Sequence, residues 1–254
     1  MFRQQQMAFL ILRVMAVILS FPSKNQHLKM FYLKYLFQFH IEELDFYSSI
    51  LGCGFLFLYR PFIKEFKWLN LYIFFQATVL SLILLTNIFL HGHSNIYLYQ
   101  VNAFGSLVAL ELYFLYTLNV FKERYAKRFF VVVNLALLLF ILFFEDRAQL
   151  NSYSYGIVSL IIAFLSFAYY SKLLQNPETI VIYRNPHFWF VTGLLLYYSL
   201  SMFIFLPYKI FTKLKMTTIK AHFVDWWILQ NFFYLLMIAF FIKGFTCKKY
   251  LKTP

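Results

Sequence analysis

Seven stretches of this chain are each long and apolar enough to cross a lipid bilayer, and short segments connect them. A transmembrane helix needs about 20 mostly apolar residues, and most of the seven approach that length without an internal Lys or Arg. The stretches are Asp45–Phe62, Trp68–Leu90, Tyr97–Phe121, Arg128–Phe144, Tyr153–Leu174, His187–Pro207 and Phe223–Lys243. We therefore predict an all-α integral membrane protein, a polytopic bundle of seven transmembrane helices.

Residues 1–44 form an N-terminal segment that precedes the predicted seven-helix domain of residues 45–254. Its first part, Met7–Pro22, is apolar but is interrupted by Arg13, and no small-residue cleavage site follows. An additional span, a signal peptide and an interfacial helix all stay open for this part. The second part, Ser23–Leu44, mixes lysines with aromatic residues, which is typical of an amphipathic helix that lies along the membrane surface.

The composition excludes a large soluble module. Hydrophobic residues make up 62% of the chain, which leaves no room for a kinase, nucleotide-binding or DNA-binding domain beside the spans. A net charge of +13 would suggest nucleic acid in a soluble protein. In a membrane protein, lysine and arginine first follow the topology. We predict the lipid bilayer as the surroundings and no nucleic-acid partner.

Lysines and arginines gather in alternate loops. The loops at Arg60–Lys67 and Lys122–Arg128 are basic, whereas His91–Ile96 has neither lysine nor arginine. Because basic loops stay in the cytoplasm, these two loops and the short basic C-terminal tail are predicted to be cytoplasmic, in the inner (cytoplasmic) membrane. The sixth loop, Tyr208–His222, carries four lysines on the predicted outer side. Its orientation stays open.

Few residues in the chain can break a helix. It contains 7 glycines and 6 prolines. Transporters often interrupt paired spans with such residues, and closely packed transmembrane helices often carry a GxxxG pattern, which is absent here. We therefore expect a bundle of unbroken helices.

Glu111 is the one acid deep inside a predicted span. An ionised carboxylate is costly at that depth, so intramembrane acids are usually protonated or paired, and many are functional. The predicted topology places Gln76 and Asn134 at similar depth, without a lysine or arginine at that level. We predict an intramembrane polar layer of Gln76, Glu111 and Asn134 in which a neutral Glu111 is hydrogen-bonded to one amide. Its role is to hold helices together, to serve as a proton or ion site, or to contact a ligand.

Polar and aromatic residues also gather at the predicted outer ends of the spans. The candidates for ligand binding are His91, His93, Asn102, Tyr153, Asp225 and Trp226. Aromatic rings with a few amides and one acid suit a small polar or weakly basic ligand. The aromatic belt and loop solvation account for part of the same set. Two histidines and one carboxylate are a poor metal site, so we predict neither a metal nor a cofactor.

Known catalytic motifs are absent from the sequence. It contains no HExxH, GxSxG or CxxC pattern, and Cys53 and Cys247 have no neighbours of a redox or metal motif. A retinal protein needs a lysine midway along its last span, and the stretch Phe223–Ile242 contains none. We predict a protein that is not an enzyme.

Two runs carry a family resemblance. Asn185–Trp189 (NPHFW) followed by Gly193–Ser199 (GLLLYYS) resembles the penultimate span of a family of uncharacterised seven-span membrane proteins of Bacteroidota. Asn87 with His91, before a span that carries Glu111, is similar to the third and fourth spans of that family. The resemblance covers roughly Leu44–Cys247. It implies a domain without catalytic modules that works beside sensor histidine kinases, and it assigns no activity and no residue role.

These observations favour a receptor-like or signalling-associated membrane protein. The alternative is a small transporter or channel that uses Glu111 as its proton or ion site, and an intramembrane enzyme is a third, weaker hypothesis. The sequence leaves open the ligand, the oligomeric state, and whether the partner is a membrane signalling protein such as a histidine kinase.

Overall fold

Helices make up all of the regular structure in the computed structural model, which describes residues 44–58, 66–89, 96–121, 123–144, 152–175, 182–213 and 217–247. All of these belong to one compact unit, Glu42–Pro254. The predictions for Met7–Pro22 and Ser23–Leu44 lie outside the described residues, apart from Leu44. The elements are α3 (Leu44–Leu58), α4 (Lys67–Phe89), α5 (Ile96–Leu112), the π-helix η2 (Tyr113–Thr117), α6 (Glu123–Phe144), α7 (Ser152–Gln175), the 3₁₀ turn η3 (Ile182–Arg184), α8 (Pro186–Lys213) and α9 (Thr217–Cys247).

The predicted all-α membrane bundle is confirmed. Six helices, α4 to α9 with η2 continuing α5, are long and apolar enough to cross a membrane. The seventh, α3, is apolar but has 15 described residues. At 1.5 Å per residue it is about 22 Å long, shorter than a hydrocarbon core of about 30 Å. Residues 59–62 of the predicted first span lie outside the described residues.

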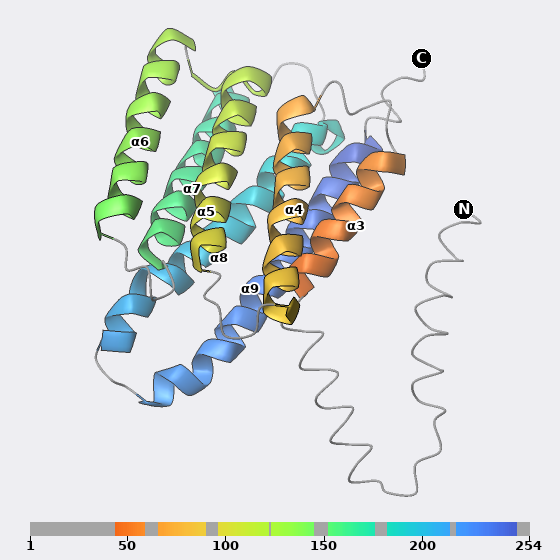
Figure 1. Cartoon of the computed structure of the whole chain (residues 1–254). Helices are drawn as coiled ribbons and strands as arrows, with labels where there is room; N and C mark the ends of the chain where they lie inside the picture. The colour runs from red at the N-terminus through yellow and green to blue at the C-terminus, as the bar shows by residue number, and fades with distance from the viewer. Residues whose placement is uncertain are drawn as a thin grey trace, which may run out of the picture. The chain divides into compact units, whose positions relative to one another are not determined.

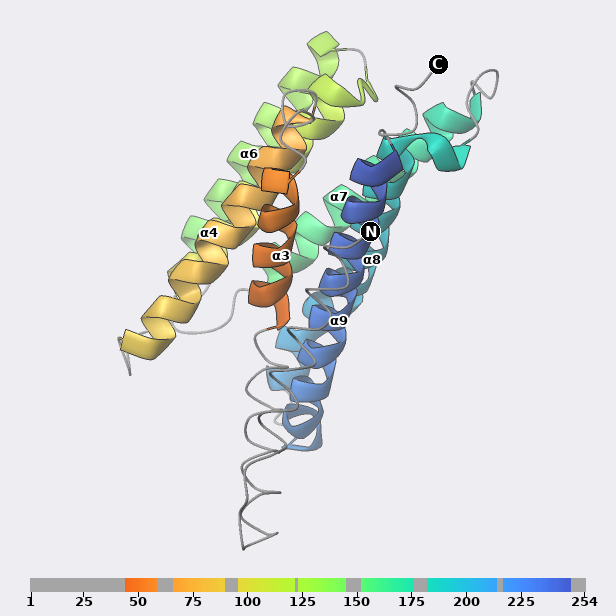
Figure 2. The same cartoon turned by 90° about the vertical axis from the view of Figure 1, so that its right-hand side faces the viewer.

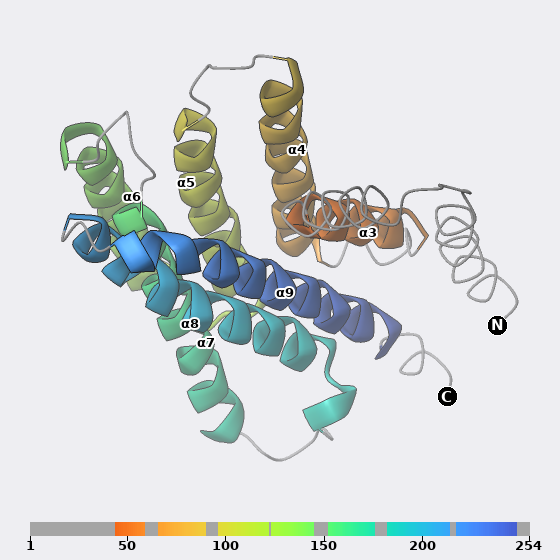
Figure 3. The ribbon, with the colours of Figure 1, turned by 90° about the horizontal axis from the view of Figure 1, so that it is seen from below.

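Consecutive helices run in opposite directions (Figure 1). Helix α3 contacts both α4 and α9 and lies between them in Figure 2. Helix α8 lies between α7 and α9 (Figure 3), and its contacts with these two are the most extensive in the bundle. Helix α6 stands at the edge, where it contacts α5, η2 and α7.

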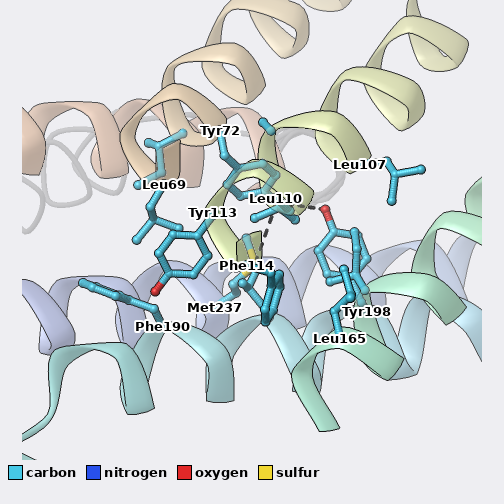
Figure 4. Close-up of a cluster of buried hydrophobic side chains, with 14 of the residues drawn as sticks. Leu69, Tyr72, Leu107, Leu110, Tyr113, Phe114, Leu165, Phe190, Tyr198 and Met237 are labelled. Atoms are coloured by element: carbon cyan, nitrogen blue, oxygen red, sulfur yellow. Dashed lines mark hydrogen bonds between the residues drawn. The ribbon is translucent and has the colours of Figure 1, made fainter. Parts of the chain in front are cut away.

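Aromatic and aliphatic side chains from six of these elements fill the centre of the bundle. Figure 4 shows Leu69 and Tyr72 of α4, Leu107 and Leu110 of α5, Tyr113 and Phe114 of η2, Leu165 of α7, Phe190 and Tyr198 of α8, and Met237 of α9, all buried. Gly193 lets α8 approach α9 closely, because a Cβ atom there would lie 3.1 Å from the Met237 carbonyl oxygen. The bundle thus achieves close packing without a GxxxG pattern.

The helix that begins as α5 continues through Thr117 without a break, but its hydrogen-bonding pattern changes. The α-helix ends at Leu112 and continues as η2, after which Asn119 adopts a φ of +52°. The Nζ of Lys172 on α7 donates hydrogen bonds to the carbonyl oxygens of Leu118, at 3.2 Å, and Asn119, at 2.6 Å. This lysine supplies donors to carbonyls that the end of a helix leaves without them.

The predicted sixth loop, Tyr208–His222, is partly helical, although the apolar spans end at Tyr208 and resume at Trp226, close to the predicted bounds. Helix α8 continues through Pro207 to Lys213, and α9 begins at Thr217. Lysine favours helices, and a helix can run beyond the hydrocarbon core once its polar residues reach the interface.

Candidate functional site

Glu111 lies in the last turn of α5 and is only 3% exposed. The Nδ2 of Asn134 on α6 donates to Glu111 Oε2, and it also donates to the Phe130 carbonyl oxygen at 2.8 Å. Asn134 is one of the two amides expected to reach Glu111. The hydrogen bond joins the edge helix α6 to the rest of the bundle.

Gln76, the other expected partner, does not bond Glu111. Its Nε2 donates to Ser106 Oγ, and Ser106 Oγ donates to the Asn102 carbonyl oxygen. Ser106 is five positions before Glu111 on α5, about 7 Å along the helix axis. The three residues of the predicted layer are therefore engaged in two separate hydrogen-bonded groups.

A larger set of hydroxyl and amide groups lies inside the bundle. They form hydrogen-bonded pairs that each join two helices, and we call the ten residues the tyrosine–amide cluster: Ser49 with Tyr234, Tyr72 with Tyr198, Gln76 with Ser106, Asn102 with Tyr155, and Gln230 with Tyr197. Eight of them are buried, and Tyr155 and Tyr197 are half-buried.

The cluster links helices in pairs. The hydroxyls of Tyr72 on α4 and Tyr198 on α8 lie 3.1 Å apart, a contact drawn in Figure 4. Ser49 Oγ on α3 lies 2.7 Å from the Tyr234 hydroxyl on α9. Because each contact crosses a helix interface, a change at one of them would alter how two helices pack.

Two amides of the cluster connect α5 with α7 and α8 with α9. Asn102 Nδ2 donates to the Tyr155 hydroxyl, and Gln230 Nε2 donates to the Tyr197 hydroxyl, both at 3.2 Å. The oxygens of the same amides, Asn102 Oδ1 and Gln230 Oε1, are buried and have no hydrogen-bond partner within the described part of the chain. Leaving a buried acceptor unsatisfied costs about 1–3 kcal/mol, so the two oxygens favour an incoming donor.

The structure places only part of the predicted outer site together. Asn102 belongs to the cluster, whereas Tyr153 is half-buried outside it and Trp226 is 41% exposed. Asp225 is helical, in the first half of α9, and its side chain lies outside the described structure, as do His91 and His93. The predicted six-residue site therefore stays a prediction.

Tyr155 and Trp227, which lie close in the sequence to the predicted Tyr153 and Trp226, pack against other rings inside the bundle. The ring of Phe205 packs against the ring of Tyr155 at 5.0 Å and that of Trp227 at 6.3 Å. The ring of Tyr99 lies 6.4 Å from that of Trp227. Helical spacing could have identified the inward side, because Trp227, Gln230 and Tyr234 recur every three or four positions on one face of α9.

A second polar contact, not predicted as a site, lies at the opposite end of the bundle. The Tyr113 hydroxyl, at the start of η2, is 2.9 Å from Nδ1 of His187 in the first turn of α8. The backbone N–H of His187 donates to Asn185 Oδ1 at 2.9 Å, so Asn185 caps α8. The sequence contained a signal here, since both residues belong to the NPHFW run.

No three His, Cys, Asp or Glu side chains gather closely enough to hold a metal ion within the residues that the structure covers. Comparison of the chain with protein-family models, with curated proteins and with solved structures gives no match. The resemblance to the Bacteroidota family stays a prediction.

Proposed function

We propose that this multi-pass membrane protein is receptor-like and signalling-associated, is not an enzyme, and binds a small polar ligand in the tyrosine–amide cluster. One observation carries the proposal: hydrogen-bonded pairs between six helices place ten hydroxyl and amide side chains inside the bundle, and two of the amide oxygens are buried without partners among the described residues. A donor from a ligand would satisfy these oxygens. Polar groups that converge inside an apolar bundle are a common design for small-molecule sites.

Ligand binding in this cluster would act on several helix interfaces at once. The contacts of Tyr72 with Tyr198 and of Ser49 with Tyr234 hold α4 to α8 and α3 to α9. A ligand that binds one arrangement of these side chains more tightly shifts the bundle toward that arrangement. We propose that a membrane signalling protein such as a sensor histidine kinase reads the change, and that the C-terminus lies in the cytoplasm, below the inner membrane.

Thermal unfolding of the full chain in lipid nanodiscs tests the proposal. A ligand at 100 times its Kd stabilises the folded state by about 2.7 kcal/mol. A library of small acids, alcohols, amides and amines should contain compounds that raise the Tm of the wild type, and the shift should be lost in Asn102→Leu.

Thr78→Val is the matched control. The Thr78 hydroxyl lies on the exposed side of α4 and bonds only within its own helix, to the Phe74 carbonyl oxygen at 2.8 Å. The control should keep the ligand-induced shift. A library without any stabilising compound, or shifts that survive in Asn102→Leu, would contradict ligand binding in the cluster.

A transporter or channel is the second candidate, because the helix of α5 changes to the π-helix η2 two residues after Glu111 and Glu111 Oε1 has no hydrogen-bond partner among the described residues. Irregular helices next to a buried acid are common in proton and ion pathways. Proteoliposomes carrying a pH-sensitive dye test this alternative. A proton flux present in the wild type and absent in Glu111→Gln would favour it over the receptor.

A further inference from the structure

Two lysines and two aromatic rings lie against one another at the end of the bundle where α4 and α6 begin. The Nζ of Lys67 lies 4.9 Å from the centre of the Trp68 ring, and that ring stacks on the ring of Tyr116, with centres 5.8 Å apart and planes at 27°. The Nζ of Lys127 lies 5.3 Å from the centre of the Tyr116 ring. We call these four residues the lysine–aromatic cluster.

Tyr116 brings the lysine–aromatic cluster together. It belongs to η2, which contacts both α4 and α6, and its ring packs against Trp68 from α4 and the ammonium of Lys127 from α6. An ammonium within about 6 Å of a ring centre is attracted to the ring face. These contacts restrict the two flexible lysine side chains beside the stacked rings, which lowers the entropic cost of binding a partner there.

The lysine–aromatic cluster lies at the boundary of the apolar spans and is accessible from outside the bundle. The spans of α4 and α6 begin at Lys67 and Lys127, and the span formed by α5 and η2 ends at Thr117, directly after Tyr116. Both lysines are exposed, Tyr116 is 47% exposed and Trp68 is half-buried. In a bilayer, span ends lie at the depth where the lipid headgroups meet the hydrocarbon.

Exposed apolar side chains follow both lysines toward the membrane interior. Leu71 lies four residues after Lys67 and is 46% exposed, and Val131 lies four residues after Lys127 and is 67% exposed. Residues four apart share one face of a helix. A molecule that covers the cluster therefore meets cations and rings at one end and apolar surface one turn deeper. The headgroup and the first part of the acyl chains of a phospholipid have this order of polarity.

We propose that the lysine–aromatic cluster is a binding site for an anionic phospholipid, separate from ligand binding in the tyrosine–amide cluster. The ammonium groups of Lys67 and Lys127 donate hydrogen bonds to headgroup oxygens, and the acyl chains lie along Leu71 and Val131. A lysine ammonium has three donors, so contact with a ring leaves it able to bind a phosphate. The two cations favour a headgroup with net negative charge over a zwitterionic one, by roughly fivefold for each lysine at the membrane surface.

Trp68 is a fluorescent reporter inside the proposed site. One variant of the full chain keeps Trp68 and has phenylalanine in place of the other three tryptophans. The matched control has all four tryptophans replaced by phenylalanine and carries Phe143→Trp, at a 74% exposed position at the other end of α6. Each is reconstituted in phosphatidylcholine vesicles with increasing shares of brominated phosphatidylglycerol or brominated phosphatidylcholine, because bromine quenches the fluorescence of a tryptophan that it contacts.

Half-maximal quenching of Trp68 should need about fivefold less brominated phosphatidylglycerol than brominated phosphatidylcholine, or less still, whereas the Phe143→Trp control should show no preference for phosphatidylglycerol. The preference at Trp68 should disappear when Lys67→Gln and Lys127→Gln are combined, and it should persist when both lysines are replaced by arginine. Lys209→Gln with Lys213→Gln removes the same charge from the last turns of α8 and should leave the preference unchanged. Thermal unfolding in phosphatidylcholine confirms that each variant is folded.

The outcomes separate a lipid site from free phosphate and from general surface charge. Equal quenching of Trp68 by the two lipids, or a preference that survives in the double glutamine variant of Lys67 and Lys127, would overturn the proposal. Loss of the preference in Lys209→Gln with Lys213→Gln would mean that total charge attracts the lipid. Glycerol phosphate carries the same phosphate without acyl chains. If it removes the preference where sodium chloride of equal ionic strength does not, the cluster binds phosphate from solution and the lipid assignment is wrong.

Discussion

The Glu111 carboxyl and the Asn134 amide share one hydrogen bond, and each has a second polar atom left over. Glu111 Oε1 and Asn134 Oδ1 are buried without a partner among the residues described. Both are acceptors when the carboxyl is ionised. A protonated Glu111 would carry a hydrogen that can be donated to the amide oxygen, which satisfies both groups. The arrangement therefore suits a neutral acid that links α5 and α6.

A neutral Glu111 makes two substitutions behave differently. Glu111→Gln keeps the size and a donor, so we expect it to change the free energy of unfolding by less than about 0.5 kcal/mol. Glu111→Leu leaves Asn134 without its partner and should cost about 1 kcal/mol or somewhat more. Reversible unfolding of both variants in bicelles measures the difference. A large loss in Glu111→Gln, comparable to that in Glu111→Leu, would mean that the charge itself matters.

At the level of single residues, the sequence predicted a contact correctly where few polar partners were available. Glu111 had to find a polar partner at its own depth, and Asn134 was one of two amides there. The sequence indicated Tyr153 and Trp226 as site residues, and not Tyr155 and Trp227, because α7 and α9 are apolar on all sides. Hydropathy then locates the helix in the membrane without showing which side faces the other helices.

Among the elements, α5 departs most from a regular helix, and Lys172 is the residue that stabilises its end. We expect Lys172→Met to expose the carbonyls of Leu118 and Asn119, with a loss of about 0.5–1 kcal/mol because the lysine is partly solvated. Amide hydrogen exchange over residues 118–121 should become faster. Lys172→Arg keeps a donor near both carbonyls and is the control. Equal exchange in the wild type and Lys172→Met would contradict this role.

Helix α6 has the smallest buried share of the six spans and offers a matched pair of leucines. Leu137 faces the bundle and is 4% exposed, whereas Leu135 is 56% exposed. Leu137→Ala should leave a gap at the interface and cost about 1 kcal/mol or more, since lost contacts are not replaced by lipid. Leu135→Ala should be close to neutral. Unfolding in bicelles compares them, and a reversed order would show that α6 packs through its other side.

Element boundaries were predictable where hydropathy alone sets them. The positions of α4 to α9 follow from long apolar runs that need no tertiary information. The π-helix after Leu112 was not predictable, because α- and π-turns differ by one residue in the hydrogen-bond step and depend on local packing. The end of α8 and the start of α9 were not predictable from hydropathy, which locates the end of an apolar span and not the end of the helix.

For the whole molecule, alternation of the helices brings the lysine and arginine side chains that the structure describes to one end of the bundle, while Lys209 and Lys213 in the last turns of α8 and Lys220 in the first turn of α9 belong to the other end. The lysine and arginine side chains that the structure describes are Lys67, Lys127, Arg128, Lys172, Arg184 and Lys243. They lie at the starts of α4, α6 and α8 and at the ends of α7 and α9. Three lie over aromatic rings, Lys67 over Trp68 at 4.9 Å, Lys127 over Tyr116 at 5.3 Å and Lys243 over Trp189 at 5.9 Å, as is common at a membrane interface.

This concentration of cations leads to the prediction that the same end, with the C-terminus, faces the cytoplasm. Basic residues near span ends are retained on that side, and anionic lipids of the cytoplasmic leaflet attract them further. Single cysteines at Lys64, Lys122 or Lys249, in a variant with Cys53 and Cys247 replaced, should resist an impermeant thiol reagent in intact cells and react after lysis. A cysteine at Asn95 should react in intact cells and is the control. Lys209 and Lys213, in the last turns of α8, lie at the opposite end of the bundle and favour the opposite orientation. If their charge set the orientation, Lys122→Cys would be labelled from outside in intact cells and Asn95→Cys would not.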